Sequence, residues 1–166
     1  ASEAERAQAG EAFDGMLNAL QRCDKPVLAA VNGLAVGIGC TLLLHCDLVL
    51  VAASARLRLP FTALGLVPEA GSSVLLPARA RWSDTMWAML SSEWIDADTA
   101  LSMGLAWRVV PDEELRKETE AVAATLAARD PAAVAATKRL LTAGRADLVR
   151  AAMERELAEM GNLYRR

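Results

Sequence analysis

Two stretches of this sequence could together carry out proton transfer. Residues 67–73 read Val-Pro-Glu-Ala-Gly-Ser-Ser and place one carboxylate, Glu69, in a turn of small residues. Residues 31–41 are rich in glycine and lead into a short apolar helix, whose first backbone N–H groups have no partner within that helix. A carboxylate base beside such donors is what the abstraction of a proton next to a carbonyl group requires.

The elements around these stretches predict an α/β fold. Continuous apolar runs, typical of strands buried on both faces, and shorter strand candidates occur at residues 27–31, 48–52, 56–59 and 107–110. A turn at Asn32-Gly33 and a loop over 34–38 lead to the first short helix. Helices are expected over residues 3–22, 39–45, 72–76, 84–90 and 97–103.

After Pro111 the pattern becomes helical throughout. Helices are expected over residues 112–128, 131–143 and 147–160, the second with Asp130 as its N-cap and Pro131 in its first position. The chain is therefore expected to divide into an α/β part, residues 1–111, and a helical region, residues 112–166.

Composition excludes several classes of function. The formal net charge of −3 gives no reason to expect nucleic-acid binding. The sequence has no run of about 20 apolar residues, so a membrane span is not expected. Cys23, Cys40 and Cys46 are odd in number and lack metal-ligand spacing, so they are interpreted as reduced, buried thiols of a cytoplasmic protein. The composition, rich in Ala and Arg, also suggests a bacterial source and a cytoplasmic location.

Several ordered motifs carry a family resemblance. The sequence resembles the crotonase (enoyl-CoA hydratase/isomerase) superfamily at residues 25–33, Ala35, Gly37, Cys46-Asp47, Ile95-Asp96-Ala97, Gly104-Leu105 and Val109-Val110. The resemblance covers about residues 13–141 and implies the ββα spiral of that superfamily with a helical C-terminal region used in assembly. It further implies an acyl-CoA thioester substrate, no metal or other cofactor beyond the coenzyme A of the substrate, and a homo-trimer or hexamer.

One family motif has no counterpart here. Family members carry an earlier segment that ends in a pattern like Ala-Phe-Ser-Ala-Gly-x-Asp and supplies the first oxyanion N–H. No stretch of this sequence matches it. The resemblance therefore implies that the chain is the C-terminal part of a longer protein, and that alone it would be poorly active.

The resemblance also assigns site residues. Hydratases of the superfamily use two glutamates, and the corresponding positions hold Thr41 and Phe61, neither of which transfers protons at neutral pH. The pattern is more similar to peroxisomal-type Δ3,Δ2-enoyl-CoA isomerases, which implies Glu69 as the single catalytic base and the Ile38 N–H as an oxyanion donor. The substrate would then be bound by Gly37, Thr41, Phe61, Leu64, Leu66 and Val67.

Alternatives remain open at this point. The whole protein could instead be an enoyl-CoA hydratase (a lyase) of fatty-acid β-oxidation, or a non-catalytic subunit of the same fold. Glu69 alone could be a solvated turn carboxylate, Thr41 could bond its own helix backbone, and His45 could be a structural residue at a helix end. Three cations could meet coenzyme A phosphates or form a solvated helix face: Lys138, Arg139 and Arg145.

Overall fold

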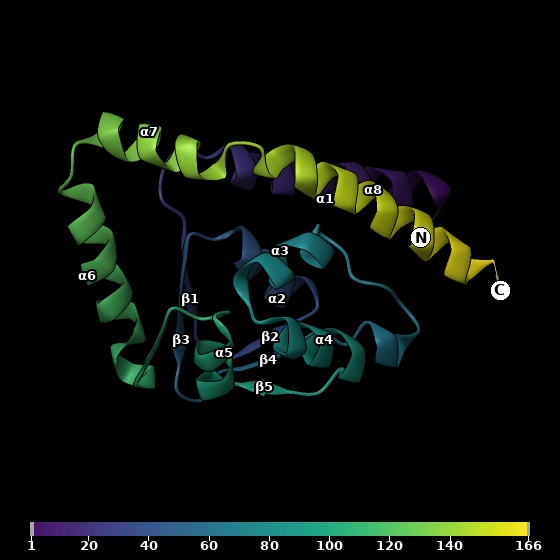
Figure 1. The fold of residues 1–166 in the computed structure, drawn as a ribbon, viewed down its shortest axis with the longest axis horizontal. Helices are drawn as coiled ribbons and strands as arrows, with labels where there is room; N and C mark the ends of the chain where they lie inside the picture. The colour runs from purple at the N-terminus through teal and green to yellow at the C-terminus, as the bar shows by residue number, and fades with distance from the viewer. Residues whose placement is uncertain (1, 166) are drawn as a thin grey trace.

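The computed structural model describes residues 2–165, apart from the side chains at positions 3, 4, 6, 7 and 9. In Figure 1 two small sheets occupy the middle of the molecule, α6 stands at one side, and α7 and α8 run along the top. None of the helices in this described part combines the length and the apolar character that a membrane crossing needs. The fold is an α/β arrangement, as the sequence predicts.

The first sheet is parallel throughout. It contains β1 (Leu28–Val31), β3 (Leu48–Ala52) and β6 (Arg108–Val110), in the order β1-β3-β6. Leu28 pairs with Leu48, and Leu50 pairs with Arg108. β3 is the central strand, so both of its edges are paired, and Val49 to Ala52 are almost fully buried, as expected for an apolar strand covered on both faces.

The second sheet contains one expected strand and two that the sequence did not predict. It contains β2 (Leu34–Val36), β4 (Arg56–Arg58) and β5 (Ile95–Asp96), with β2 parallel and β5 antiparallel to β4. The expectation of a loop over residues 34–38 is wrong, because residues 34–36 pair with β4. A strand of three residues forms here through distant pairing rather than through a local pattern.

The helices in the first two thirds of the chain follow the predicted order. They are α1 (Glu3–Arg22), α2 (Ile38–Thr41), α3 (Ser72–Arg79), α4 (Trp82–Ser91) and α5 (Ala97–Met103), with 3₁₀ turns η1 (Leu42–His45) and η2 (Thr62–Leu64). Ser2 and Glu5 form the capping box that starts α1, and Asp96 accepts the Thr99 N–H to cap α5. The α4 helix has no side-chain cap, since its N-cap residue is Arg81.

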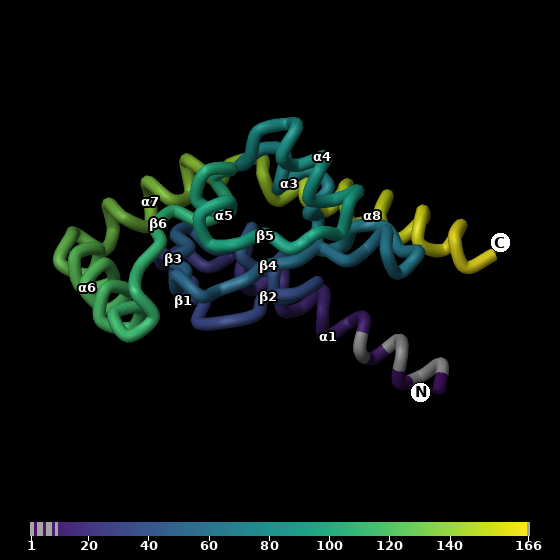
Figure 2. The backbone as a smooth tube through the Cα atoms, turned by 90° about the horizontal axis from the view of Figure 1, so that it is seen from below, coloured from purple at the N-terminus to yellow at the C-terminus, as the bar shows by residue number. Residues whose placement is uncertain are grey.

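The last third is helical apart from its turns. A 3₁₀ turn η3 (Asp112–Glu114) precedes α6 (Leu115–Ala127), then α7 (Pro131–Thr142) and α8 (Arg145–Tyr164). Asp130 caps α7 by accepting the Ala133 N–H, as predicted. The α8 helix begins earlier and ends later than expected, and Figure 2 shows it running alongside α3.

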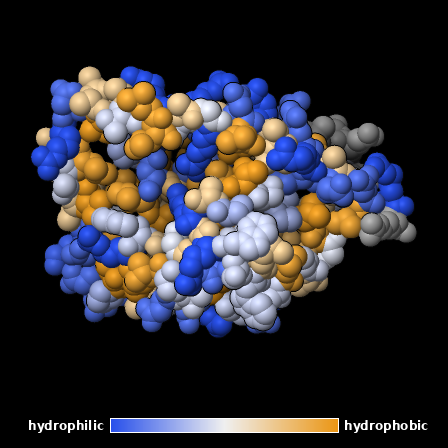
Figure 3. Space-filling view, in the orientation of Figure 1, coloured by the Kyte–Doolittle hydropathy of each residue, from blue (hydrophilic) through white to orange (hydrophobic). Residues whose placement is uncertain are grey.

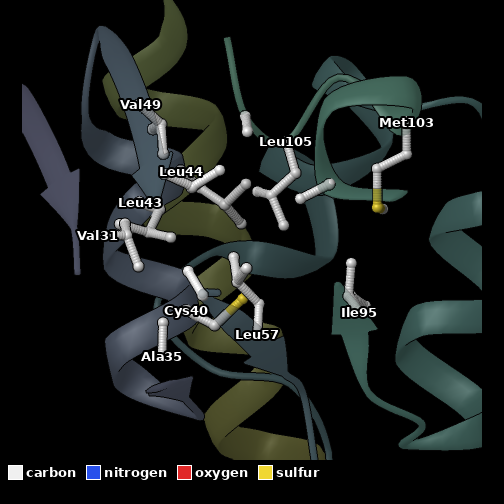
Figure 4. Close-up of a cluster of buried hydrophobic side chains, with 14 of the residues drawn as sticks. Val31, Ala35, Cys40, Leu43, Leu44, Val49, Leu57, Ile95, Met103 and Leu105 are labelled. Atoms are coloured by element: carbon white, nitrogen blue, oxygen red, sulfur yellow. The ribbon is translucent and has the colours of Figure 1, made fainter. Parts of the chain in front are cut away.

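The main core lies between the two sheets and the short helices. Figure 4 shows side chains from β1, β3, β4, β5 and η1 directed toward one another, among them Val31, Val49 and Leu57. Leu50 and Leu57 are fully buried. This shared core fixes α2 and η1 against both sheets, so the glycine-rich segment before α2 is held on a rigid support.

A separate hollow lies beside α6. It has a volume of about 430 Å³ and is lined by Ala30, Asn32, Leu115, Arg116, Thr119 and Glu120. On the face toward the viewer, Figure 3 shows apolar residues gathered between the region of α6 and the body of the molecule. Neither Glu69 nor Thr41 lines the hollow, so it is distinct from the candidate site.

Candidate functional site

Glu69 lies in a tight turn between η2 and α3. The two residues after it have left-handed backbone angles, with φ of 61° at Ala70 and 70° at Gly71. The Glu69 carbonyl accepts the backbone N–H of Ser72 at 3.0 Å and the Ser72 hydroxyl at 2.6 Å. Ser72 therefore closes the turn, while the helix N-cap itself is Gly71, which has no side chain to serve as a cap.

The Glu69 side chain reaches across to α2. Its Oε1 lies 2.6 Å from the Thr41 hydroxyl, which donates the hydrogen bond. The Ile38 carbonyl lies 3.4 Å from the same hydroxyl, so the bond to Glu69 is the strong one. Thr41 is fully buried. Glu69 is therefore not a solvated turn carboxylate, and Thr41 does more than bond its own helix.

Three effects set the pKa of the Glu69 carboxyl: its burial and two neighbouring groups. Burial raises the pKa of the Glu69 carboxyl above its usual value, the Thr41 hydroxyl lowers the pKa, and the negative charge of Glu156 raises it again. The net direction is upward. A carboxylate with a raised pKa is a stronger base, which suits the removal of a weakly acidic proton from carbon.

Ile38 starts the helix that faces this carboxylate. Its N–H is in the first position of α2 and so has no acceptor within the helix. Gly37 precedes it with φ 55° and ψ −120°, a conformation that favours glycine, and its own N–H bonds the Arg58 carbonyl at 3.0 Å. The strand β4 thus holds Gly37 in place, and the structure brings Ile38, Thr41 and Glu69 together.

The remaining predicted substrate residues differ in exposure. Phe61 is buried in the core, Leu66 and Val67 are half-buried, and Leu64 is 64% exposed. Leu64 therefore does not form part of a closed apolar wall in this structure. Phe61 excludes water from its surroundings rather than offering a polar group.

The structure adds two residues that sequence reasoning missed or left undecided. Glu156 of α8 accepts the Gly71 N–H at 2.8 Å and the Ser73 N–H at 2.9 Å. His45 Nε2 lies 2.8 Å from the Ala70 carbonyl oxygen, so this nitrogen carries the hydrogen. The turn that presents Glu69 is thus bound from both sides. The sequence signal that could have identified Glu156 is its helical spacing from Val149 and Ala152, the two other residues of α8 that are buried in the structure.

Two arginines bind the end of η1. Arg79 donates to the carbonyls of Leu43 and Cys46 at 2.9 and 2.7 Å, and Arg145 donates to the Leu44 carbonyl. These cations take the helix-end role that the sequence suggested for His45. Burial lowers the pKa of His45, and both arginine charges lower it further.

The other cations proposed for coenzyme A have partners within the chain. Lys138 binds Asp47 at 2.6 Å and the Lys25 carbonyl at 2.7 Å, and its side chain is only 13% exposed. Arg139 pairs with Asp24 at the surface. In this structure Lys138 and Arg145 are therefore structural groups, and neither belongs to a freely solvated helix face.

The cysteines are mostly as expected. All three are free; Cys40 and Cys46 are buried, while Cys23 is half-buried, so its predicted burial is wrong. Burial raises the pKa of the Cys40 thiol to about 12, which keeps it protonated and unreactive. Among the described residues no group of three or more His, Cys, Asp and Glu side chains is arranged to hold a metal.

Comparison with known proteins decides the family. The sequence profile described as enoyl-CoA hydratase/isomerase matches residues 1–163, nearly the entire chain. The chain belongs to the enoyl-CoA hydratase/isomerase family. The family resemblance carried by the motifs at residues 25–33 and 46–47 is therefore confirmed.

Individual members of the family support the same grouping. A probable enoyl-CoA hydratase of Rhodobacter capsulatus is 39% identical over 153 residues, which cover 92% of this chain and 60% of the relative. A 1,2-epoxyphenylacetyl-CoA isomerase of Escherichia coli is 37% identical over 115 residues, covering 69% of this chain and 44% of the relative. The chain thus spans roughly half of the length of these curated relatives.

Solved structures of the family confirm the fold. An enoyl-CoA hydratase/isomerase of Pseudoalteromonas atlantica superposes with a TM-score of 0.85 at 42% identity, covering 89% of this chain and 59% of that one. An enoyl-CoA hydratase of Mycobacterium avium subsp. paratuberculosis gives a TM-score of 0.84 at 33% identity, covering 90% of this chain and 61% of that one.

Proposed function

We propose that the protein shifts the double bond of a 3-enoyl-CoA thioester to the 2 position, with Glu69 as the single proton-transfer group. The observation that carries the proposal is the pairing of a half-buried Glu69 with the buried Thr41 hydroxyl at 2.6 Å. The raised pKa of the Glu69 carboxyl and the first N–H of α2, which has no acceptor within its helix, support the proposal.

The reaction needs no other acid or base. The Glu69 carboxylate takes a proton from C2 of the substrate, and the C2–H electron pair moves into a dienolate whose charge falls on the thioester oxygen. The Ile38 N–H donates to that oxygen, and one such donor typically contributes roughly 2.7–4 kcal/mol to the transition state. The protonated Glu69 then returns the proton to C4, so the double bond moves from C3–C4 to C2–C3 and the mass is unchanged.

The residues at positions 41 and 61, where hydratases of the superfamily carry glutamates, favour isomerisation over hydration. Addition of water across a double bond calls for groups that orient the water and exchange protons with it. Thr41 is committed to Glu69 through its only hydrogen, and Phe61 is buried and apolar. With one carboxylate and no polar group at Phe61, transfer of a single proton between two carbons is the simpler reaction for this site.

Hydration is the second candidate, and a specific observation favours it. Several relatives carry hydratase names, including the Rhodobacter protein and a crotonyl-CoA hydratase of Syntrophomonas wolfei that is 33% identical over 125 residues. The Escherichia coli relative is instead named a 1,2-epoxyphenylacetyl-CoA isomerase, so isomerase names also occur among the relatives. The names of these relatives therefore favour a hydratase, whereas Thr41, Phe61 and Glu69 favour an isomerase.

Product analysis separates the two candidates. The longest available form of the protein is incubated with a 3-enoyl-CoA and, separately, with a 2-enoyl-CoA, and products are resolved by mass and ultraviolet absorbance. A conjugated product of unchanged mass from the 3-enoyl-CoA supports isomerisation. A product heavier by one water from the 2-enoyl-CoA, with no shift of the 3-enoyl-CoA, would reject it in favour of hydration.

A matched pair of variants then assigns the role of Glu69. Glu69→Gln keeps the size and removes the base, so turnover should fall by about 10²–10⁴. Glu154→Gln makes the same change at an exposed position on α8 and should leave turnover unchanged. Equal activity of the Glu69→Gln variant and the parent protein would show that another group transfers the proton.

A further inference from the structure

The turn that presents Glu69 is connected to the far end of the chain. Glu156 is 7% exposed, and its two carboxylate oxygens each accept one backbone N–H, from Gly71 and from Ser73. These N–H groups belong to the N-cap and the second residue of α3. A helix start normally finds such acceptors in its own N-cap side chain, but Gly71 has none.

The packing of α8 against this turn is equally close. A Cβ added to Gly71 would lie 2.7 Å from Cγ1 of Val149, which is fully buried on α8. Gly71 also has φ 70°, so both the backbone angle and the approach of α8 favour glycine here. Val149, Ala152 and Glu156 form one buried stripe of α8, and that stripe faces the turn.

On the other side, the turn is held by α2 and η1. His45 of η1 donates to the Ala70 carbonyl at 2.8 Å, and Thr41 of α2 donates to the Glu69 carboxylate. Backbone groups on either side of Gly71 are therefore bound by side chains from two different elements. The left-handed angle at Ala70, which is unfavourable for a residue other than glycine, persists between these two supports.

We infer that Glu156 is a positioning residue for Glu69, and that α8 is therefore part of the machinery that aims the catalytic carboxylate. This inference rests on the proposed function of Glu69. Glu156 does not touch the substrate in this role. It fixes the backbone from Gly71 to Ser73, and that backbone fixes the direction of the Glu69 side chain.

The decisive variant is Glu156→Gln. A carboxylate accepts with both oxygens, whereas an amide accepts with one oxygen and its NH₂ group only donates. The variant keeps the size of the side chain but leaves one of the two backbone N–H groups without an acceptor. Glu154→Gln, two residues away on the exposed face of α8, removes the same charge and is the control.

Two measurements on the longest available form of the protein test the role. Amide hydrogen exchange at Gly71 and Ser73, without substrate, should become faster on the order of tenfold in Glu156→Gln, with exchange in β3 unchanged. The kcat for the thioester should fall by about 10–100-fold with little change in KM, since a misdirected base slows the chemical step rather than binding. Both assays are run well below the melting temperature of each variant.

Glu156→Asp provides a second variant if Glu156→Gln folds poorly. It keeps the charge but withdraws the carboxylate by one methylene group, so the same pattern should appear in weaker form. Unchanged exchange at Gly71 and Ser73, or an unchanged kcat beside faster exchange, would overturn the positioning role. A parent protein inactive on both the 3-enoyl- and the 2-enoyl-CoA would reject the proposed function, and the exchange comparison would still decide whether Glu156 holds the turn.

Discussion

The carboxylate of Glu69 and the hydroxyl of Thr41 lie 2.6 Å apart, although 28 residues separate them in the sequence. The contact joins the turn before α3 to Thr41, the last residue of α2. This hydrogen bond helps to fix the direction of the Glu69 side chain, and it lowers the pKa that burial and the charge of Glu156 raise.

Removing the Thr41 hydroxyl should make Glu69 harder to ionise. The hydroxyl lowers the pKa of Glu69, so Thr41→Val should raise it, and the acid limb of kcat/KM should move to higher pH. Thr41→Ser retains the hydroxyl and should leave the limb near its original position. Rate profiles of the three proteins from pH 4 to 8 provide the measurement, and a limb that stays in place in Thr41→Val would contradict the prediction.

Gly71→Ala should destabilise the protein by about 2–4 kcal/mol, combining the unfavourable left-handed angle with the clash against Val149. Urea unfolding gives the free energies. Gly15→Ala is the matched control: this exposed glycine lies inside α1 with no atom near its added Cβ, so the same change should stabilise by about 0.5–1 kcal/mol. In a double-mutant cycle, Val149→Ala should recover part of the cost of Gly71→Ala, because it removes the clashing methyl groups. Additive effects would show that the clash is absent.

Stability should fall as the solution is acidified through the range where His45 titrates. Burial holds the pKa of His45 below 6.5, so the unfolded chain binds a proton that the folded protein excludes. The unfolding free energy contributed by His45 is thus complete above pH 6.5 and decreases below it. His45→Gln keeps a donor for the Ala70 carbonyl without titrating, so its stability should depend less on pH between 7 and 5. Parallel curves for the two proteins in chemical denaturation would refute this.

The partly shielded ion pair of Lys138 with Asp47 should matter more than the neighbouring exposed pair of Arg139 with Asp24. Lys138→Met removes the bonds to Asp47 and to the Lys25 carbonyl and should cost about 1–3 kcal/mol, because the Lys138 side chain is only 13% exposed and makes two charge-assisted hydrogen bonds. Arg139→Ala breaks an exposed pair with Asp24 and should cost less than about 1 kcal/mol. Denaturant unfolding of both variants at low and high salt gives the two losses of unfolding free energy. A larger loss for Arg139→Ala than for Lys138→Met would contradict the prediction.

Much of the fold could be predicted because its signals are local. The apolar run at residues 48–52 matches β3, and the Ser2 and Glu5 pattern marks the start of α1. The strands β2 and β5 were missed because they have three and two residues and exist only through pairing with β4. No periodicity can emerge from so few positions.

The candidate site was predictable in part. The family resemblance singled out Glu69, Ile38 and Thr41, and the structure brings these three together. The bond between Thr41 and Glu69 could not be predicted, since it depends on how the α3 turn packs against α2. The role of Glu156 also depends on tertiary packing: its sequence context, a helix rich in charges, is typical of a solvated face.

The contact between Glu156 and Gly71 has a consequence for the order of biosynthesis. A ribosome makes the chain from its N-terminal side, so the turn at residues 69–73 is synthesised while 83 or more residues up to Glu156 are still to be added. Until α8 arrives, the Gly71 and Ser73 N–H groups are left to water. Both sheets can thus form in the nascent chain before the turn at Glu69 receives its contacts from α8.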